Sequence, residues 1–375
     1  MEKNVSIRPE RLLGNNLKIL IVGTGLFGSV LARELTDLGY ICHVIDRRTH
    51  VGGNCYTENV NSINVHKYGP HIFHTSNKIV WDYLHKHTTV NHFSCRPKLK
   101  YGDRVYSFPI NLMTLNQLWN VTTPEEANAK LLEVTKKHKK DVYTNAEEWA
   151  LGNVGEEIYE IFYKGYLLKQ WNKNPIDIPS EIMARQVVRM DYNDSYYYDP
   201  YQGIPDYTQL FKSLLNGISV ELGVDYLKDR EQFNSNYDKI IYCGPIDEFF
   251  DYKFGALEYR SLKFEEEILP IKDYQGTFMV SHPEKEFAYT RIIEHKHFDF
   301  GQQEFTVITK EYPQDWEIGM EAFYPVNDIK NQKIYEKYNK IDVGNKLIFG
   351  GRLGSYKYLN MDQTIENALE LIKKI

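Results

Sequence analysis

Apolar and polar positions at the beginning of the chain follow a pattern typical of an α/β protein. Residues 18–22 (KILIV) form an apolar run typical of a buried strand, and leucines recur at helical spacing over residues 31–38. A second apolar run, residues 41–45, leads to Asp46. This order predicts a strand, a turn, a helix and a second strand, which together begin a Rossmann-like unit.

The rest of the chain divides into a helix-rich stretch and a strand-rich stretch. From residue 79 to about 166, helical pieces alternate with turns, and a threonine–proline pair at 123–124 is a good helix start. Residues 172–179 contain two prolines and several turn formers, so we expect a loop there. From about residue 189 to 324, aromatic and β-branched residues favour strands, and a last helix is expected over 361–374.

Three glycines between the first strand and the first helix predict a dinucleotide site. Gly23, Gly25 and Gly28 form the pattern G-x-G-x-x-G, which lets the backbone approach a pyrophosphate at the N-terminus of a helix. Asp46, at the end of the next strand, is placed to accept hydrogen bonds from a ribose. The site expected from this unit consists of Gly23, Gly25, Leu26, Phe27, Gly28 and Asp46.

The residues around this motif favour FAD over NAD. Arg47 and Arg48 are followed by residues 52–54 (GGN), a continuation familiar from FAD proteins. Near the other end, residues 350–352 (GGR) precede a helix and resemble the segment that returns a flavoprotein chain to its cofactor. We therefore expect both ends of the chain in one FAD-binding domain.

Composition excludes several classes of protein. The 375 residues are 42% hydrophobic and 26% charged, enough for two or three globular domains. A net charge of −6 does not favour a nucleic-acid partner, and no apolar run reaches the roughly 18–20 residues of a membrane span. Residues 1–16 are charged and lack the apolar centre of a signal peptide, so we expect a leader on a cytoplasmic protein.

Two histidines lie in a polar and aromatic stretch, residues 66–75. His71 and His74 are three residues apart, but no acid or third histidine accompanies them at a recognised spacing, so no metal site is expected. They are either structural histidines that bond to the backbone or neighbours of a flavin ring. The four cysteines are also too far apart in sequence for a zinc motif or a disulfide framework.

An aromatic stripe occupies residues 162–171. Phe162, Tyr163 and Tyr166 follow helical spacing, which fits either a core stripe or a wall that holds a nucleotide base. Gly165 and Trp171, together with the proline-containing loop that follows, favour the wall. The 29 tyrosines are open to the same two interpretations, half-buried sheet faces or a pocket that bonds phosphates and sugar hydroxyls.

Taken together, these motifs resemble those of the prokaryotic UDP-galactopyranose mutases, and the resemblance extends along nearly the whole chain from Lys18. The matching segments are residues 23–28, 52–54, 68–75, 162–171, 185, 192–196, 202–205, 258–262, 290–298, 324–325 and 351–358. The chain departs from that family at Asn360, where relatives commonly have aspartate; asparagine keeps an acceptor but loses the charge.

The resemblance implies an α/β fold with a discontinuous Rossmann-like FAD-binding domain, an inserted helical domain and an antiparallel β-sheet domain. The expected ranges are 17–78, 205–255 and 340–375 for the FAD-binding domain, 79–180 for the mainly helical domain with a mobile loop at 172–185, and 181–204 with 256–339 for the sheet domain.

The resemblance also implies an activity and partners. In that family, reduced FAD attacks the anomeric carbon of the sugar through N5, and UDP-galactopyranose and UDP-galactofuranose interconvert without net oxidation. It implies a UDP-galactose substrate, an external reductant such as NAD(P)H, a homodimer and a product used for cell-surface polysaccharide. Whether the 2-acetamido sugar is also a substrate stays open.

Site residues follow from the resemblance position by position. Catalytic roles are expected for Arg185, Arg291, His71 and His74. Substrate contacts are expected from Phe162, Tyr163, Tyr166, Trp171, Arg185, Tyr196, Arg260, Arg291, Tyr324 and Tyr358. Cofactor contacts are expected from Gly23, Gly25, Leu26, Phe27, Gly28, Asp46, Arg47, Gly53, Asn54, His71, Arg352, Tyr358, Asn360 and Met361. The loop that precedes Arg185 is expected to act as a lid that brings this arginine onto the diphosphate.

Three other functions share some of these features. A flavin oxidase or dehydrogenase would have the same fold but would consume an electron acceptor. A nicotinamide-dependent epimerase would use a Tyr-x-x-x-Lys pair, and Tyr259 and Lys263 have that spacing, although in a strand-like segment. A catalytically inactive nucleotide-sugar binding module would have lost its catalytic residues, and here those residues are present. The arginines and the aromatic wall favour the mutase.

Overall fold

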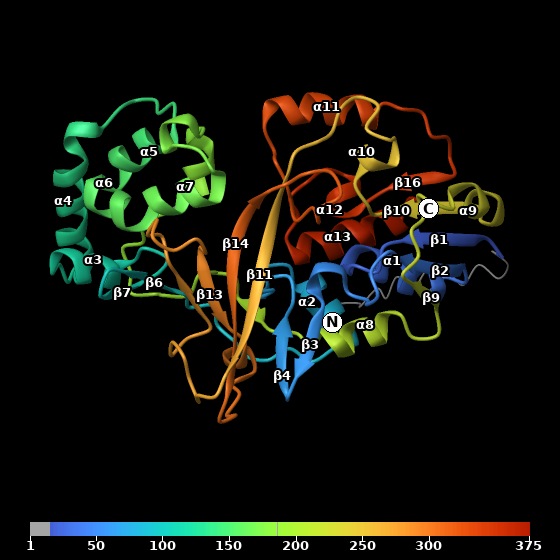
Figure 1. Cartoon of the computed structure of the whole chain (residues 1–375), viewed down its shortest axis with the longest axis horizontal. Coiled ribbons are helices and arrows are strands. Elements are labelled where there is room, and N and C mark those ends of the chain that lie inside the picture. Colours follow the sequence, from blue (N-terminus) through green and yellow to red (C-terminus); the bar gives the residue numbers. More distant parts are fainter. Residues whose placement is uncertain (1–15, 186) are drawn as a thin grey trace, which may run out of the picture.

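The computed structural model describes residues 16–185 and 187–375. It contains two large β-sheets, one of which lies between a helical lobe and the part of the molecule that holds the other sheet and the C-terminal helices (Figure 1). The first sheet has five parallel strands in the order β16-β10-β1-β2-β9. Its strands are β1 (Lys18–Val22), β2 (Ile41–Asp46), β9 (Ser219–Leu222), β10 (Lys239–Tyr242) and β16 (Leu347–Phe349).

The two ends of the chain meet on this sheet. Helix α1 (Leu26–Asp37) follows β1 and packs against α13 (Met361–Ile372), which follows β16. Leu31 and Leu35 of α1 and Ala368 of α13 have no exposed surface. The predicted strand–turn–helix–strand unit is therefore confirmed, and so is the return of the C-terminal segment to it.

The second sheet has seven strands in the order β15-β11-β14-β13-β12-β6-β7. The strands are β6 (Lys98–Tyr101), β7 (Arg104–Ser107), β11 (Tyr259–Leu269), β12 (Met279–Ser281), β13 (Arg291–Glu294), β14 (Thr306–Asp315) and β15 (Tyr324–Pro325). All pairings are antiparallel except that of β12 with β6, which is parallel. Because β6 and β7 come from the helix-rich stretch, this sheet runs continuously into the helical lobe.

The helical lobe consists of α3 (Leu112–Trp119), α4 (Pro124–Thr135), α5 (Ala146–Asn153), α6 (Gly155–Ile158) and α7 (Gly165–Trp171). The helix start predicted at 123–124 is confirmed, since Thr123 caps α4 and Glu126 completes a capping box. Between α6 and α7 the chain forms one π-helical stretch, Tyr159–Lys164. The loop expected at 172–179 contains only a short 3₁₀ turn, Pro175–Asp177.

The expectation of strands throughout 189–324 is wrong for its middle part. Helices α8 (Tyr207–Leu214), α9 (Arg230–Asn236) and α10 (Ile246–Phe249) occupy it, and α11 (Ile329–Asn339) follows. Helix α8 buries Tyr207, Leu210, Phe211 and Leu214, an i, i+3, i+4, i+7 set behind the N-cap Asp206. The aromatic residues of this segment thus belong to a helix packed against α1 and α2, not to a strand.

Two small sheets and α2 complete the fold. Strands β3 (Thr57–Val60) and β4 (Ile63–His66) form a hairpin, and β5 (Phe73–Thr75) pairs with β8 (Tyr201–Gly203). Helix α2 (Lys78–His87) packs against α8 and α13 and so joins the core of the five-stranded sheet. In the described part of the chain, no helix has the length and apolar character needed to cross a bilayer. The expected leader lies, apart from residue 16, outside the described residues.

Candidate functional site

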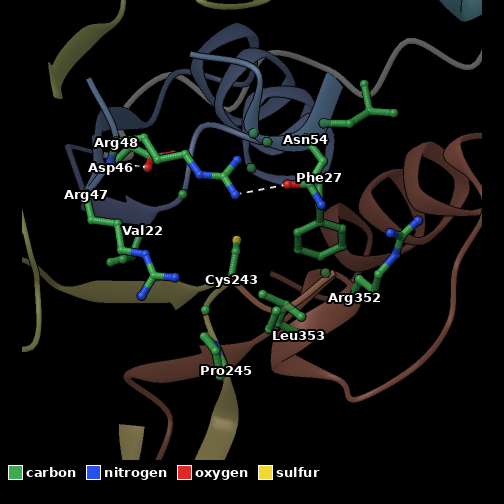
Figure 2. A pocket seen from close by; sticks show the side chains of 18 of the residues that line it. Val22, Phe27, Asp46, Arg47, Arg48, Asn54, Cys243, Pro245, Arg352 and Leu353 are labelled. Carbon is green, nitrogen blue, oxygen red and sulfur yellow. Dashed lines mark hydrogen bonds between the residues drawn. The ribbon is translucent and has the colours of Figure 1, made fainter. Parts of the chain in front are cut away.

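A cavity open to solvent lies at the carboxyl ends of the parallel strands, where the segment before β15 also bounds it (Figure 2). Ligands of α/β proteins commonly bind at this end of a parallel sheet. The lining of this cavity includes most of the residues predicted for the cofactor, namely Gly23, Gly25, Leu26, Phe27, Gly28, Asp46, Arg47, Gly53, Asn54, His71, Arg352 and Met361. Tyr358 and Asn360 are not among its lining residues.

Glycines at this cavity let three backbone segments approach one another. A Cβ atom on Gly28 would lie 2.0 Å from the carbonyl oxygen of Gly23, and one on Gly53 would lie 2.9 Å from the Cα of Gly25. The N-cap of α1 is Gly25, which has no side chain to occupy the first-turn amides. The wall is therefore bare backbone next to a helix N-terminus, which fits a pyrophosphate.

Asp46 fixes the glycine turn. Its Oδ2 accepts hydrogen bonds from the backbone N of Thr24 at 2.7 Å and from the Thr24 hydroxyl at 2.6 Å, and its Oδ1 accepts one from the backbone N of Arg48 at 2.9 Å. The predicted ribose acceptor thus also holds the loop in place. Each carboxylate oxygen can accept two hydrogen bonds, so Oδ1 has capacity left for a ribose hydroxyl, and the ribose role stays a prediction.

Two arginines beside Asp46 bind an acid that the sequence analysis did not identify. Arg48 donates to Asn54 Oδ1 at 3.0 Å (Figure 2) and to Glu321 Oε2 at 2.6 Å, while Arg47 lies 3.6 Å from both Glu321 and Glu248. Glu321 comes from the segment before β15, so this contact brings the sheet region to the cavity. No local sequence motif predicts the role of Glu321, because the arginines that it contacts lie far away in sequence.

The two predicted histidines lie in different environments. His71 lines the cavity, and its Nδ1 lies 2.9 Å from the carbonyl oxygen of Gly69. Burial lowers the pKa of His71 to about 4, so the ring is neutral near pH 7, with Nδ1 as the donor and Nε2 as an acceptor. His74 instead stacks on Tyr197 at 3.6 Å and pairs with Asp199 at 2.8 Å.

Arg352 joins the cavity to a group of tyrosines. It is the second residue of the short helix α12 (Gly351–Gly354) and donates to the carbonyl oxygens of Phe323 at 3.2 Å and Leu359 at 2.6 Å. Its guanidinium lies 5.8 Å from the ring of Tyr324 and 5.2 Å from that of Tyr358. At this end the cavity therefore borders on a group of tyrosines that contact Arg352.

Arg291, the first residue of β13, lies among the same tyrosines. It donates to Glu311 Oε2 on β14 at 2.7 Å, and the Glu311 side chain is only 4% exposed. Although burial works against the charged form, Glu311 raises the pKa of Arg291 above its usual value. Burial raises the pKa of Tyr324 too, with Glu311 adding to the rise and Arg291 opposing it, which places all three groups in one electrostatic neighbourhood.

The residues of the predicted aromatic wall differ in how far they are buried. Phe162 and Tyr163 are 2% and 5% exposed and belong to the core of the helical lobe, where Phe162 packs on Tyr106 and Phe108. Tyr166, one turn further on, has a side chain that is 38% exposed, although burial around its hydroxyl raises its pKa to about 12 and Arg291 opposes that rise. In this structure Tyr166, not Phe162, presents an accessible face.

The remaining predicted arginines are placed as follows. Arg260 on β11 donates to Asp315 Oδ1 at 2.6 Å and to the carbonyl oxygen of Gln170 at 2.5 Å, so its guanidinium links the second sheet to the end of α7. Arg185 ends a 3₁₀ helix that begins at Ser180, and its side chain lies outside the described structure. Their substrate roles stay predictions.

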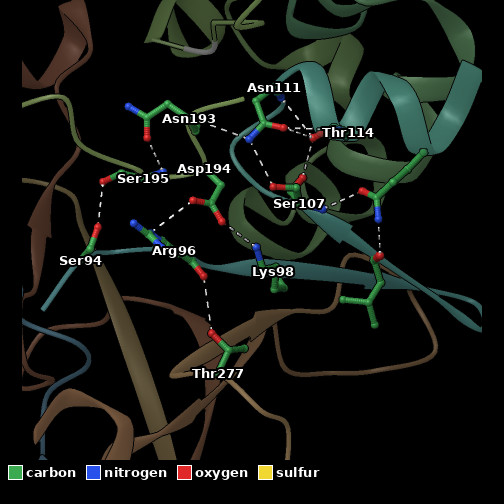
Figure 3. Close-up of polar contacts among 12 residues, drawn as sticks. Ser94, Arg96, Lys98, Ser107, Asn111, Thr114, Asn193, Asp194, Ser195 and Thr277 are labelled. Carbon is green, nitrogen blue, oxygen red and sulfur yellow. Dashed lines mark hydrogen bonds and ion pairs between the residues drawn. The ribbon is translucent and has the colours of Figure 1, made fainter. Parts of the chain in front are cut away.

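A polar network holds the segment that carries Tyr196 (Figure 3). Asp194 pairs with Lys98 of β6 at 3.2 Å, and Asn111, the N-cap of α3, donates to the carbonyl oxygen of Asn193 at 3.3 Å. The backbone N of Tyr196 donates to the carbonyl oxygen of Cys95 at 2.6 Å. Tyr196 is 39% exposed, and a smaller effect of Arg291 opposes the rise that burial gives its pKa.

One group of three residues within the described ranges is close enough to hold a metal ion: Asp273, Glu294 and His297. The His297 Nε2 lies 3.4 Å from both carboxylates, and Glu294 also accepts hydrogen bonds from Thr306 and from two backbone amides. Despite burial, the carboxylate of Glu294 raises the pKa of His297. The contacts of His297 with the two carboxylates account for the closeness of these three residues.

Two family models match the chain. Residues 161–358 match the model described as UDP-galactopyranose mutase, and residues 21–86 match the NAD(P)-binding Rossmann-like domain. The first covers most of the second sheet, Arg291 and the tyrosines, and the second covers the glycine turn.

Curated relatives agree with these matches. A protein of Klebsiella pneumoniae described as a probable UDP-galactopyranose mutase is 39% identical over 95% of this chain and 94% of its own. A dTDP-fucopyranose mutase of Escherichia coli is 38% identical over 94% of this chain and 97% of its own. Among solved structures, a reduced UDP-galactopyranose mutase superposes with a TM-score of 0.74 at 16% identity, over 96% of this chain and 94% of that one.

Proposed function

Because the chain belongs to the UDP-galactopyranose mutase family, we propose that it interconverts UDP-galactopyranose and UDP-galactofuranose without net oxidation. The observation that carries this proposal is the position of Arg291 and the tyrosines beside the cavity that the glycine turn lines. A cationic, hydroxyl-rich surface beside a cofactor site is what a nucleotide sugar needs if its anomeric carbon is to reach that cofactor.

The cofactor of this reaction is a flavin, and we propose FAD. The bare glycine wall and the N-terminus of α1 would hold the pyrophosphate, and Asp46 would accept from a ribose hydroxyl. Reduced flavin would supply the nucleophile, its N5, that displaces UDP from the sugar. His71, neutral and with Nε2 as an acceptor, would bond a donor group at the ring end of the site.

Release of UDP concentrates negative charge on the diphosphate, and preorganised donors lower the barrier. Arg291 would be such a donor, because the buried carboxylate of Glu311 keeps it charged and oriented. The hydroxyls of Tyr196, Tyr324 and Tyr358 would add hydrogen bonds to the phosphates. Arg185 would join them from the loop that follows α7.

The base of the nucleotide would stack on the accessible part of the aromatic wall. Tyr166 and Trp171 would make this contact, while Phe162 and Tyr163 would support the wall from behind. In this proposal the polar network around Asp194 keeps Tyr196 opposite the wall.

A second candidate function is supported by the relatives. The E. coli dTDP-fucopyranose mutase is 38% identical to this chain and the K. pneumoniae protein 39%, so identity does not separate the two substrates. A dTDP-6-deoxyhexose differs from UDP-galactose by a methyl group on the base, by deoxyribose in place of ribose and by loss of the sugar 6-hydroxyl. The chemistry at C1 would be the same for both.

The test uses flavin-loaded protein reduced with dithionite. We expect conversion of UDP-galactofuranose to UDP-galactopyranose, and little conversion with oxidised protein. Parallel incubations with dTDP-fucofuranose and with the 2-acetamido substrate rank the three sugars by kcat/KM. Oxygen or acceptor consumption with each turnover would instead indicate an oxidoreductase. Absence of conversion of every nucleotide sugar by reduced, flavin-loaded protein would refute the proposal.

A further inference from the structure

Lys169 on α7 is enclosed by backbone carbonyl groups. Its Nζ lies 3.0 Å from the carbonyl oxygen of Glu284, 3.1 Å from that of Phe287 and 2.8 Å from that of Tyr289, and it also donates to the carbonyl oxygen of His282. All four acceptors belong to the connection between β12 and β13. A lysine ammonium has three hydrogens, so this cage uses its whole donor capacity.

The same connection touches α7 at a second point. A Cβ atom on Gly165 would lie 2.1 Å from the carbonyl oxygen of Pro283, so only glycine lets the helix come this close. Gly165 is also where the π-helical stretch ends and α7 begins. Lys169 and Gly165 are one turn apart, and together they fix both the distance and the rotation of α7 relative to the connection.

The two elements held together carry the two halves of the proposed substrate site. On α7, Tyr166 precedes Lys169 by three residues and Trp171 follows it by two. On the other side, His282 donates its backbone N–H to the carbonyl oxygen of Thr290 at 2.8 Å, and the next residue is Arg291. The cage therefore closes within two residues of the arginine.

We propose that Lys169 is a positioning residue that sets the spacing between the nucleotide-stacking face of α7 and the diphosphate-binding Arg291. The inference rests on the proposed function, since it assumes a ligand that touches both. A ligand bound at two points is sensitive to their spacing, and a displacement of about 1 Å can reduce the rate by about 100-fold.

Lys164 on the same helical segment provides a matched control. Its Nζ pairs with Glu160, four residues before it, at 2.6 Å, and its side chain is 43% exposed. Replacement of Lys164 by methionine removes the same charge and length without touching the connection. A comparison of Lys169→Met with Lys164→Met therefore distinguishes the effect of losing the carbonyl cage from the effect of losing any cation on this helical segment.

The experiment measures UDP binding to oxidised, flavin-loaded protein by titration calorimetry at pH 7, below the pKa of about 8 to which burial lowers Lys169. We expect Lys169→Met to keep its flavin and to weaken UDP binding on the order of 10-fold or more, and to raise KM more than it lowers kcat. Lys164→Met should bind like the unchanged protein. Lys169→Gln, which keeps an N–H donor, should lie between the two.

Equal UDP affinity of flavin-loaded Lys169→Met and Lys164→Met would overturn the inference. Loss of flavin and of folding in both Lys169 variants would overturn it as well, since the role would then be stability of the whole lobe. Failure of the unchanged protein to bind UDP would refute the proposed function itself. Normal UDP binding by all variants would instead refute only the role of Lys169.

Discussion

The ion pair of Arg291 and Glu311 allows stability and ligand binding to be separated. Glu311 is 4% exposed and Arg291 is 27% exposed, so Arg291→Met leaves a carboxylate buried without its counter-charge. Breaking a buried pair in this way costs about 3–5 kcal/mol of folding free energy. Replacing both partners by neutral groups removes that penalty, so the double variant Arg291→Met with Glu311→Gln should recover to within about 1–2 kcal/mol of the unchanged protein.

Binding should not recover in the double variant. Removing one partner of a buried charge pair costs about 2–5 kcal/mol in affinity, which corresponds to roughly a 30-fold or larger rise in the Kd for UDP. We expect this rise in Arg291→Met and in the double variant alike. Glu311→Gln alone should keep most of the affinity, because the guanidinium is still present.

The assays are urea unfolding for stability and calorimetry with UDP for binding, on flavin-loaded protein. A double variant as unstable as Arg291→Met would show that the buried charge of Glu311 is not the cause of the loss. A double variant that binds UDP as the unchanged protein does would remove Arg291 from the diphosphate site.

Three further predictions concern the cofactor site, acid stability and the last helix. Gly28→Ala should lower the flavin-to-protein absorbance ratio and cost about 1–3 kcal/mol, since its Cβ would lie 2.0 Å from the Gly23 oxygen; full flavin content would contradict this. Burial lowers the pKa of His295 to about 3, so the unfolded chain gains a proton near pH 6.5 while the folded protein does not, and stability falls as the pH drops below 6.5. His295→Gln should make that fall shallower by about 1.4 kcal/mol per pH unit in urea titrations, and an unchanged slope would argue against a neutral, buried ring. Asn360→Asp, at the N-cap of α13, should add about 0.3–1 kcal/mol and leave the pH profile of activity unchanged, whereas a shifted profile would place this residue in the reaction.

The parts of the fold that could be predicted are those encoded by local patterns. The glycine turn, the two strands around it and the last helix follow from neighbouring residues, and the structure has them as Lys18–Val22, Ile41–Asp46 and Met361–Ile372. Helix α8 was missed although its signal was present, since Asp206 and the spacing of its apolar residues are both local. The aromatic residues of this segment are typical of a strand, whereas the spacing of its apolar residues is that of a helix.

The candidate site was less accessible to sequence reasoning, because its geometry depends on distant partners. The pairing of Arg48 with Glu321 spans 273 positions, and no motif links the two residues. Similarly, helical spacing could not tell that Phe162 is buried and Tyr166 exposed, because the break into a π-helical stretch depends on tertiary packing. The cage around Lys169 gives no sequence signal, since its acceptors are main-chain oxygens.

The parallel pairing of β12 with β6 limits how the molecule can open. Val280 and Ser281 are in register with Lys98 and Leu99, so the ladder passes without interruption from the sheet into the lobe that bears α7. A rigid-body rotation of that lobe away from the sheet would break the backbone hydrogen bonds between β12 and β6, and solvent would not fully replace them during the motion. We therefore expect a bulky nucleotide sugar to enter through movements of the loops around the site, while the pairing of β12 with β6 stays intact.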